Sequence, residues 1–270
     1  MIPSARLIRN RKSANLHSGH LFMIIERHIV IDKLKYTVVL SDNTDSLQAA
    51  YQAGKAVVGI WDSSRPEHSL FPAQYVVESL DDADDAFLEK VIRRRFHLPL
   101  IIASTERLVI REFTLEDLPV IPLEEEAGED DKIFQSQETL YAYIQNQYCF
   151  YEYGIWAVVR KEDGALIGKA GVTPAEPADW KSDGQTVYHL SETACSVSES
   201  PIENFSDLPP VELGYHIFRP FRRQGYALEA CKAVIGYCRE EISPNLFLRI
   251  NKKNLPSQKT AEKSGFKPVF

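Results

Sequence analysis

A basic turn between a strand-like segment and a helix-like segment carries the clearest chemical signal in this chain. Residues 211–217 alternate apolar and polar side chains, as a half-buried strand does. Arg222, Arg223 and Gly225 follow directly, and a helix is expected over residues 226–241. A helix N-terminus offers free backbone N–H groups and a positive dipole end, to which the two guanidinium groups add charge. We therefore expect an anion-binding site at this turn.

The composition is that of an ordinary soluble protein. The 270 residues are 44% hydrophobic and 26% charged, enough for one large domain or two modest ones. No apolar run approaches the roughly 20 residues that a membrane helix needs. The first residues lack the apolar core and cleavage site of a signal peptide. We expect a cytoplasmic protein that does not bind membranes.

The net charge argues against a nucleic-acid-binding protein, and the cysteine pattern argues against a disulfide-bonded one. A net charge of −7 argues against a nucleic-acid partner. Cys149, Cys195, Cys231 and Cys238 are scattered, with no Cys-x-x-Cys pair. Cys231 and Cys238 fall on one face of the expected helix, two turns or ~10 Å apart, too far for a disulfide. We interpret them as reduced core thiols and expect no metal site.

The N-terminal part, residues 1–102, is predicted to be a small Rossmann-like parallel α/β unit. Its strands are short continuous apolar runs, typical of strands buried on both faces. The apolar segment 21–25 has no clear period and could be a helix or a strand. The expected order is a strand at 37–40, a helix at 45–53, strands at 56–60 and 75–77, and a helix at 81–96.

The C-terminal part, residues 103–270, is predicted to be an α+β domain with a mixed sheet. Thr114 is expected to cap a short helix, and residues 162–164 to form a hairpin turn. Residues 174–210 are polar and rich in Pro, Ser and Glu, so we expect an inserted loop. The remaining elements are expected as strands at 108–113, 155–159, 165–171, 246–250 and 266–270, and helices at 139–151 and 256–263.

A segment of the N-terminal unit resembles haloacid-dehalogenase-like folds. An Asp-bearing turn precedes a helix of the type Ala-Ala-x-x-Ala-Gly and then a short strand, over about residues 37–80. The nucleophilic Asp-x-Asp-x-Thr motif of that family is missing, so phosphatase chemistry is not expected. We interpret Asp42 and Asp45 as turn and helix-capping residues rather than metal ligands. The matching positions are Asp42, Ala49, Ala50, Ala53, Gly54 and Val57 to Ile60.

Residues 104–270 resemble the GNAT superfamily of N-acetyltransferases. Arg222-x-x-Gly225-x-Ala227 is similar to the family's pyrophosphate loop. Asn254-x-x-Ser257, followed by residues 262–266, is similar to its second signature. Thr105-Glu106-Arg107-Leu108 resembles the first strand of the ribosomal-protein N-terminal acetyltransferase branch. The three pieces occur in the family's order and on the expected elements.

The resemblance implies that acetyl-coenzyme A is the cosubstrate. Backbone N–H groups at the basic turn would hold the pyrophosphate, with glycine allowing close approach. The pantetheine arm would lie along the strand that precedes the turn, in the manner of an added strand. The expected cofactor contacts are Ile217, Phe218, Arg219, Arg222, Arg223, Gln224, Gly225, Tyr226, Ala227, Asn254 and Ser257.

Acetyl transfer to an amine requires that the amine lose a proton, that the carbonyl be polarised and that the departing thiolate be protonated. Glu212 is the first candidate base and His216 the second, each with a structural interpretation beside it. Many relatives have a tyrosine four residues before Gly-Phe in the last helix, where this chain has Ala261. Ser257 could hydrogen-bond the sulfur, so the source of the proton stays open.

The expected function is acetyl transfer to a primary amine, a protein N-terminus or a small molecule, by direct attack in a ternary complex. The alternatives are a non-catalytic acyl-coenzyme A binding module and an N-terminal unit that directs the transferase to its target. Trp180, Tyr188 and His189 in the insertion are candidate acceptor contacts or local packing residues. The chain stops at Phe270, where the resembling family normally continues into a seventh strand, so either the sequence is truncated or another segment or subunit supplies that strand. We expect a monomer or homodimer.

Overall fold

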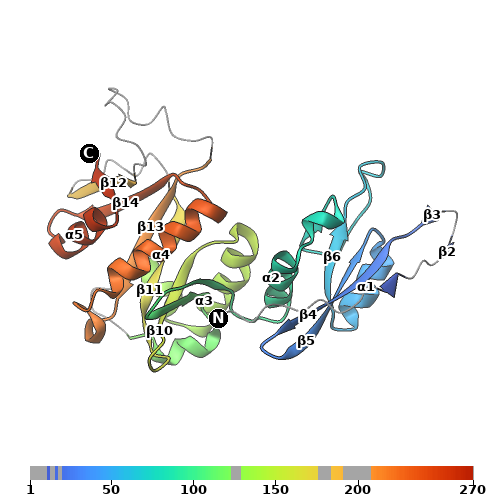
Figure 1. The fold of residues 1–270 in the computed structure, drawn as a ribbon, viewed down its shortest axis with the longest axis horizontal. Helices are drawn as coiled ribbons and strands as arrows, with labels where there is room; N and C mark the ends of the chain where they lie inside the picture. The colour runs from blue at the N-terminus through green and yellow to red at the C-terminus, as the bar shows by residue number, and fades with distance from the viewer. Residues whose placement is uncertain are drawn as a thin grey trace. The chain divides into compact units, whose positions relative to one another are not determined.

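The structure, a computed structural model, describes residues 11–12, 16–17, 20–122, 129–175, 184–190 and 208–269. The chain divides into two compact units, residues 1–100 and 101–270 (Figure 1). Both contain mixed sheets with helices, so the predicted α/β class is confirmed. Within the described residues, no helix is long and apolar enough to cross a membrane. Cys195 and Trp180 lie outside the described residues.

The N-terminal unit is a five-stranded sheet in the order β1-β4-β5-β6-β7. Strands β5, β6 and β7 are parallel, as predicted, whereas β4 pairs with β5 as an antiparallel hairpin. Helices α1 and α2 cover opposite faces, because each packs on its own apolar cluster. The bounds are β1 (Arg11–Lys12), β2 (Leu16–His17), β3 (His20–Leu21), β4 (Ile24–Ile31), β5 (Leu34–Ser41), α1 (Thr44–Gln52), β6 (Ala56–Ile60), β7 (Val76–Val77), η1 (Leu80–Asp82) and α2 (Asp85–Arg95).

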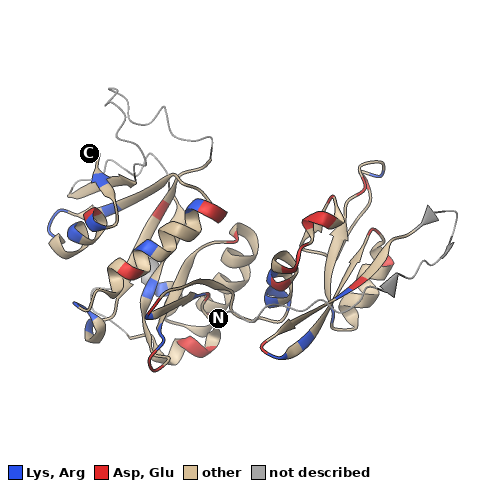
Figure 2. Ribbon diagram, viewed as in Figure 1, with Lys and Arg blue, Asp and Glu red and all other residues tan. Residues whose placement is uncertain are grey.

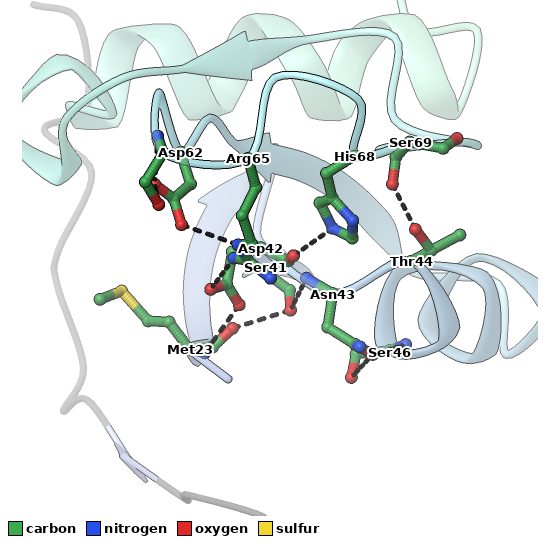
Figure 3. A network of polar contacts seen from close by, with 11 residues as sticks. Met23, Ser41, Asp42, Asn43, Thr44, Ser46, Asp62, Arg65, His68 and Ser69 are labelled. Carbon is green, nitrogen blue, oxygen red and sulfur yellow. Dashed lines mark hydrogen bonds and ion pairs between the residues drawn. The ribbon is translucent and has the colours of Figure 1, made fainter. Parts of the chain in front are cut away.

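A polar network closes the carboxyl end of this parallel sheet (Figure 3). Asp42 accepts hydrogen bonds from the Met23 backbone N–H at 2.8 Å and from Arg65 Nη2 at 2.9 Å. Arg65 also donates to Asp62 at 2.8 Å, which fastens the loop after β6 to the end of β5. Asn43 caps α1 by accepting from the Ser46 N–H at 2.9 Å. The network has the turn and capping roles expected for this segment.

The C-terminal unit is an eight-stranded sheet in the order β15-β12-β14-β13-β11-β10-β9-β8. Strand side chains alternate between two covered faces: Trp156 meets Tyr237 of α4, while its neighbours Ile155 and Ala157 pack in the cluster beneath α3. The bounds are β8 (Ile101–Ser104), β9 (Leu108–Arg111), η2 (Leu115–Val120), η3 (Glu129–Phe134), α3 (Gln137–Tyr143), η4 (Ile144–Tyr151), β10 (Ile155–Arg160), β11 (Leu166–Pro174), β12 (Gln185–Leu190), β13 (Val211–Ile217), η6 (Arg219–Phe221), α4 (Tyr226–Glu241), β14 (Leu246–Asn251), α5 (Leu255–Lys263) and β15 (Phe266–Pro268).

Two predictions for this unit need correction. The helix expected over 139–151 is an α-helix only to Tyr143 and continues as a π-helix to Tyr151. The segment 174–210, expected as an inserted loop, contains strand β12. This strand lies between β14 and β15 and is antiparallel to both. Strands β14 and β15 therefore each have β12 as a hydrogen-bonded neighbour.

Candidate active site

The sheet opens between β13 and β14. These strands run parallel, and they pair only at Val211 with Leu246 and at Glu212 with Phe247. Both continue beyond that point, β13 to Ile217 and β14 to Asn251, without further pairing between them. Beyond Glu212, the edge of β13 that faced β14 therefore has no paired strand among the described residues. An extended chain of ligand can pair with such an edge as an added strand does.

The basic turn at the far end of β13 has the backbone of an anion site. Arg223 and Gly225 adopt positive φ angles of 64° and 83°. Helix α4 begins at Tyr226 with no side chain capping its first turn. The first amide N–H groups of a helix have no carbonyl partner within the helix, and here no side chain caps them. Residues 223–225 are exposed, which leaves the turn open to a phosphate.

Several predicted cofactor residues have identifiable positions around this turn. Arg222 folds back along β13, because its Nε donates to the Ile217 carbonyl at 2.8 Å and its Nη2 lies 3.3 Å from His216 Nε2. An arginine has only donors, so this contact places a lone pair on His216 Nε2. Phe218 is buried and its N–H donates to the Ile167 carbonyl at 2.9 Å. Its amide belongs to the sheet.

The other predicted cofactor residues of this region lie in the turn itself or directly before and after it. Arg219 belongs to the 3-10 turn η6, and its carbonyl accepts from the Arg222 N–H at 3.3 Å. The Gln224 side chain reaches the Pro220 carbonyl at 3.5 Å. Tyr226 is buried at the start of α4, and Ala227, the next residue, is half-buried.

The second signature forms the start of α5. Asn254 is the N-cap residue, and its Oδ1 accepts from the Ser257 N–H at 3.2 Å. Tyr215 of β13 reaches across to this helix, because its hydroxyl donates to the Ser257 carbonyl at 2.9 Å. Burial is the main cause that raises the pKa of Tyr215, so the phenol stays protonated. Tyr215 was missed in the sequence because it looked like one more apolar position in the strand.

Glu212 marks the point where the two strands part. Both of its oxygens accept from Arg249 Nε, at 3.0 and 2.8 Å, and Arg249 Nη2 lies 2.8 Å from Oε2. Arg249 comes from β14 beyond the last paired residue, so the ion pair ties the diverging strands together. Glu212, Gly214 and His216 share the face toward α3, opposite to Tyr215. The two candidate bases therefore lie on one face and the second signature on the other.

The insertion residues of β12 are packed into the sheet. Tyr188 and His189 are only 3% and 4% exposed. The His189 ring lies 4.6 Å from the Phe247 ring, and burial lowers the pKa of this histidine. Their surroundings match the packing interpretation, since neither side chain reaches the surface.

The charges near the site contrast with the acidic chain as a whole. Figure 2 shows basic residues at the turn before α4 and on α5, although the net charge is −7. Lys252 and Lys253 lie exposed in the turn between β14 and α5. Clustered basic side chains attract an anionic ligand. Among the described residues, no three His, Cys, Asp or Glu side chains gather where they could hold a metal ion.

Sequence comparison agrees with this geometry. Residues 107–267 match the Acetyltransferase (GNAT) domain family, and this chain belongs to that family. GNAT acetyltransferases use acetyl-coenzyme A as the acetyl donor, so membership of this family supports acetyl transfer in general. The match spans more than half of the chain and includes all of the candidate site residues.

Solved structures with similar folds are distant in sequence. A GnaT-family acetyltransferase from Bordetella pertussis has 18% identity and a TM-score of 0.44, over 64% of this chain and 90% of that one. A ribosomal-protein-S5-alanine acetyltransferase from Vibrio fischeri has 14% identity and a TM-score of 0.41, over 61% and 81%. A ribosomal L7/L12 alpha-N-protein acetyltransferase in complex with coenzyme A has 13% identity and a TM-score of 0.42, over 61% and 82%.

Proposed function

We propose that this protein is an N-acetyltransferase that moves an acetyl group from acetyl-coenzyme A to a primary amine by direct attack in a ternary complex. The observation that supports this most is the separation of β13 and β14 after Glu212, with the open turn of Gly225 at the far end of β13. The edge of β13 can take an extended pantetheine arm while the helix N-terminus takes the pyrophosphate.

The reaction needs little chemistry from the protein once both substrates are placed. The neutral amine nitrogen attacks the thioester carbon, a C–N bond forms and the C–S bond breaks. The nitrogen loses one proton and the sulfur gains one, so no net proton is consumed. Orientation of two bound reactants can supply as much as ~7–11 kcal/mol of the barrier reduction. A strong protein base is therefore not required.

We assign Tyr215 to the departing sulfur. Its hydroxyl lies on the α5 face of β13 and donates to the Ser257 carbonyl, and the raised pKa keeps the phenol protonated. When the cofactor binds, this single O–H would turn from the carbonyl to the sulfur. A phenol with a raised pKa is a weak acid, so it would stabilise the sulfur by hydrogen bonding while the amine supplies the proton. Tyr215→Phe should then lower kcat and leave the affinity for coenzyme A nearly unchanged.

We propose that Glu212 holds β13 and β14 together at the point where they separate, and that it does not remove the amine proton. Both carboxylate oxygens already accept hydrogen bonds from Arg249, so the side chain is held in place by its partner. His216 faces the same side, with Arg222 donating toward its Nε2. The acceptor would enter on this face, either as a peptide N-terminus or as a small amine.

A cofactor titration followed by an acceptor screen tests the proposal. Acetyl-coenzyme A is titrated into the full chain by calorimetry. Free thiol is then followed while peptides with free N-termini, their N-acetylated counterparts and small amines are added. Thiol release that depends on a free amine supports the proposal. Absence of acetyl-coenzyme A binding would overturn it.

A second candidate, a non-catalytic acyl-coenzyme A binding module, is favoured by two observations. The first candidate base is held by Arg249, and the helix α5 has Ala261 where many relatives have a tyrosine. Tight binding of acetyl-coenzyme A with no thiol release across the whole acceptor panel would support this candidate over the enzyme.

A further inference from the structure

We infer that Arg107 is a positioning residue for the pyrophosphate turn, held in register by Glu229 and Thr105. This inference rests on the proposed function, because it concerns how the same turn receives the cofactor. Arg107 lies in the tight turn between β8 and β9, far from Gly225 in the sequence. Its backbone is fixed there, since the Lys161 N–H donates to the Arg107 carbonyl at 2.9 Å.

One side chain contacts almost the whole junction between the turn and α4. Arg107 Nη1 donates to the Gln224 carbonyl at 3.0 Å, and its guanidinium lies 4.6 Å from the centre of the Tyr226 ring. A Cβ atom added to Gly225 would lie 3.4 Å from Arg107 Nη2. The guanidinium is thus packed against three consecutive residues of the turn.

The contact with Gln224 sets the direction of the neighbouring amide. The Gln224 carbonyl and the Gly225 N–H belong to one planar trans peptide, so they point in opposite directions. Because Arg107 holds the carbonyl on its own side, the Gly225 N–H is turned to the other side, away from Arg107. This is the N–H that the pyrophosphate would meet first. Arg107 therefore acts through the peptide plane.

Glu229 keeps the guanidinium in this position. Its carboxylate accepts from Arg107 Nε at 2.7 Å, from the Arg107 backbone N–H at 3.1 Å and from the Thr105 hydroxyl at 2.6 Å. A carboxylate in the first turn of α4 would by itself oppose an incoming phosphate, and the ion pair with Arg107 neutralises it. The pair thus fixes geometry while cancelling an unfavourable charge.

The decisive experiment compares two acyl donors in three variants. S-Acetylpantetheine lacks the pyrophosphate, so a residue that organises the pyrophosphate turn should not affect it. Arg107→Gln is expected to raise Kd and KM for acetyl-coenzyme A about 10- to 100-fold, the loss of charge-assisted hydrogen bonds, with kcat and the KM for S-acetylpantetheine unchanged. Arg107→Lys, which keeps the charge without the planar fork, should recover only part of the affinity.

Glu229→Gln separates positioning from simple attraction. It makes the turn more positive, so if Arg107 served only as a charge, binding of acetyl-coenzyme A would tighten. If the ion pair positions Arg107, binding weakens. Arg27→Gln, which breaks a comparable pair with Asp85 in the N-terminal unit, is the control and should leave both donors unaffected. Thermal melts confirm that each variant is folded.

The outcomes that overturn the inference are distinct from failure of the proposed function. Unchanged acetyl-coenzyme A affinity in Arg107→Gln, tighter binding in Glu229→Gln, or equal losses for both acyl donors would each overturn it. If the unaltered protein binds neither acyl donor, the proposed function itself fails.

Discussion

The ion pair between Glu212 and Arg249 yields a prediction that can be worked from its geometry. Glu212→Gln and Arg249→Gln each remove one charge, and the double variant removes both. The two side chains are 19% and 30% exposed and make close charge-assisted contacts of 2.8 to 3.0 Å. Such a pair falls between exposed pairs, worth roughly 0.2–1 kcal/mol, and buried pairs, whose disruption costs about 3–5 kcal/mol. We expect a coupling free energy of about 1–2 kcal/mol.

Unfolding of the C-terminal unit is the measurement for this coupling. Trp61 is the single tryptophan among residues 1–100, so a Trp61→Phe background leaves fluorescence that reports the C-terminal unit. A coupling of this size corresponds to about 2–8 °C in the melting midpoint of a unit of this length. The double variant should be more stable than the sum of the single losses predicts, because each single variant leaves one charge unpaired.

The same variants decide what Glu212 does in the reaction. If the pair holds β13 and β14 together where they separate, both single variants lower kcat to a similar extent and the double variant is no worse than either. If Glu212 removes the amine proton, Glu212→Gln loses activity while Arg249→Gln retains it. Additive losses in stability, together with that asymmetric loss of activity, would refute the proposal that Glu212 holds the two strands together.

Three further predictions concern the turn and the core. Gly225→Ala should weaken acetyl-coenzyme A binding, whereas Gly54→Ala, with a similar positive φ of 77°, should cost stability alone; calorimetry and melts separate the two. Burial raises the pKa of Glu229, but hydrogen bonds from Thr105 and Arg107 outweigh it and lower the pKa overall. The unaltered protein should therefore be more stable than Glu229→Gln at pH values above the ordinary carboxylate pKa. This extra stability should be lost as the pH falls through the lowered pKa of Glu229. Tyr148→Phe should cost about 1–3 kcal/mol in urea unfolding, because the buried hydroxyl donates to the Ile155 carbonyl at 2.6 Å.

The turn and its helix could be predicted because their signals are local. Alternation along β13, a glycine at the required positive φ and the apolar face of α4 all lie within one stretch, and the expected helix bounds agree with α4. The cap at Thr114 was predicted for the same reason, since an N-cap residue bonds to residues only a few positions on.

The missed features depend on partners distant in the sequence. Strand β12 is a short segment in a polar stretch, and its pairing with β14 and β15 is what makes it a strand. The apolar segment 21–25 was ambiguous because it has no clear period, and its pairing with β5 as part of strand β4 is what decides for a strand. Arg249 and Arg107 gained roles for the same reason, through Glu212 and Glu229. The likeness of residues 37–80 to haloacid-dehalogenase-like folds stays a prediction.

Calorimetric titration of acetyl-coenzyme A into the unaltered protein and into Gly225→Glu tests the central claim most directly. The unaltered protein should bind with a Kd in the ~1 µM to 1 mM range of ordinary enzyme substrates. Gly225→Glu should abolish binding, since it places a carboxylate and a strained backbone where the pyrophosphate would lie. Gly54→Glu is the matched control and should bind normally. Absence of binding by the unaltered protein, or unchanged binding by Gly225→Glu, would contradict the account.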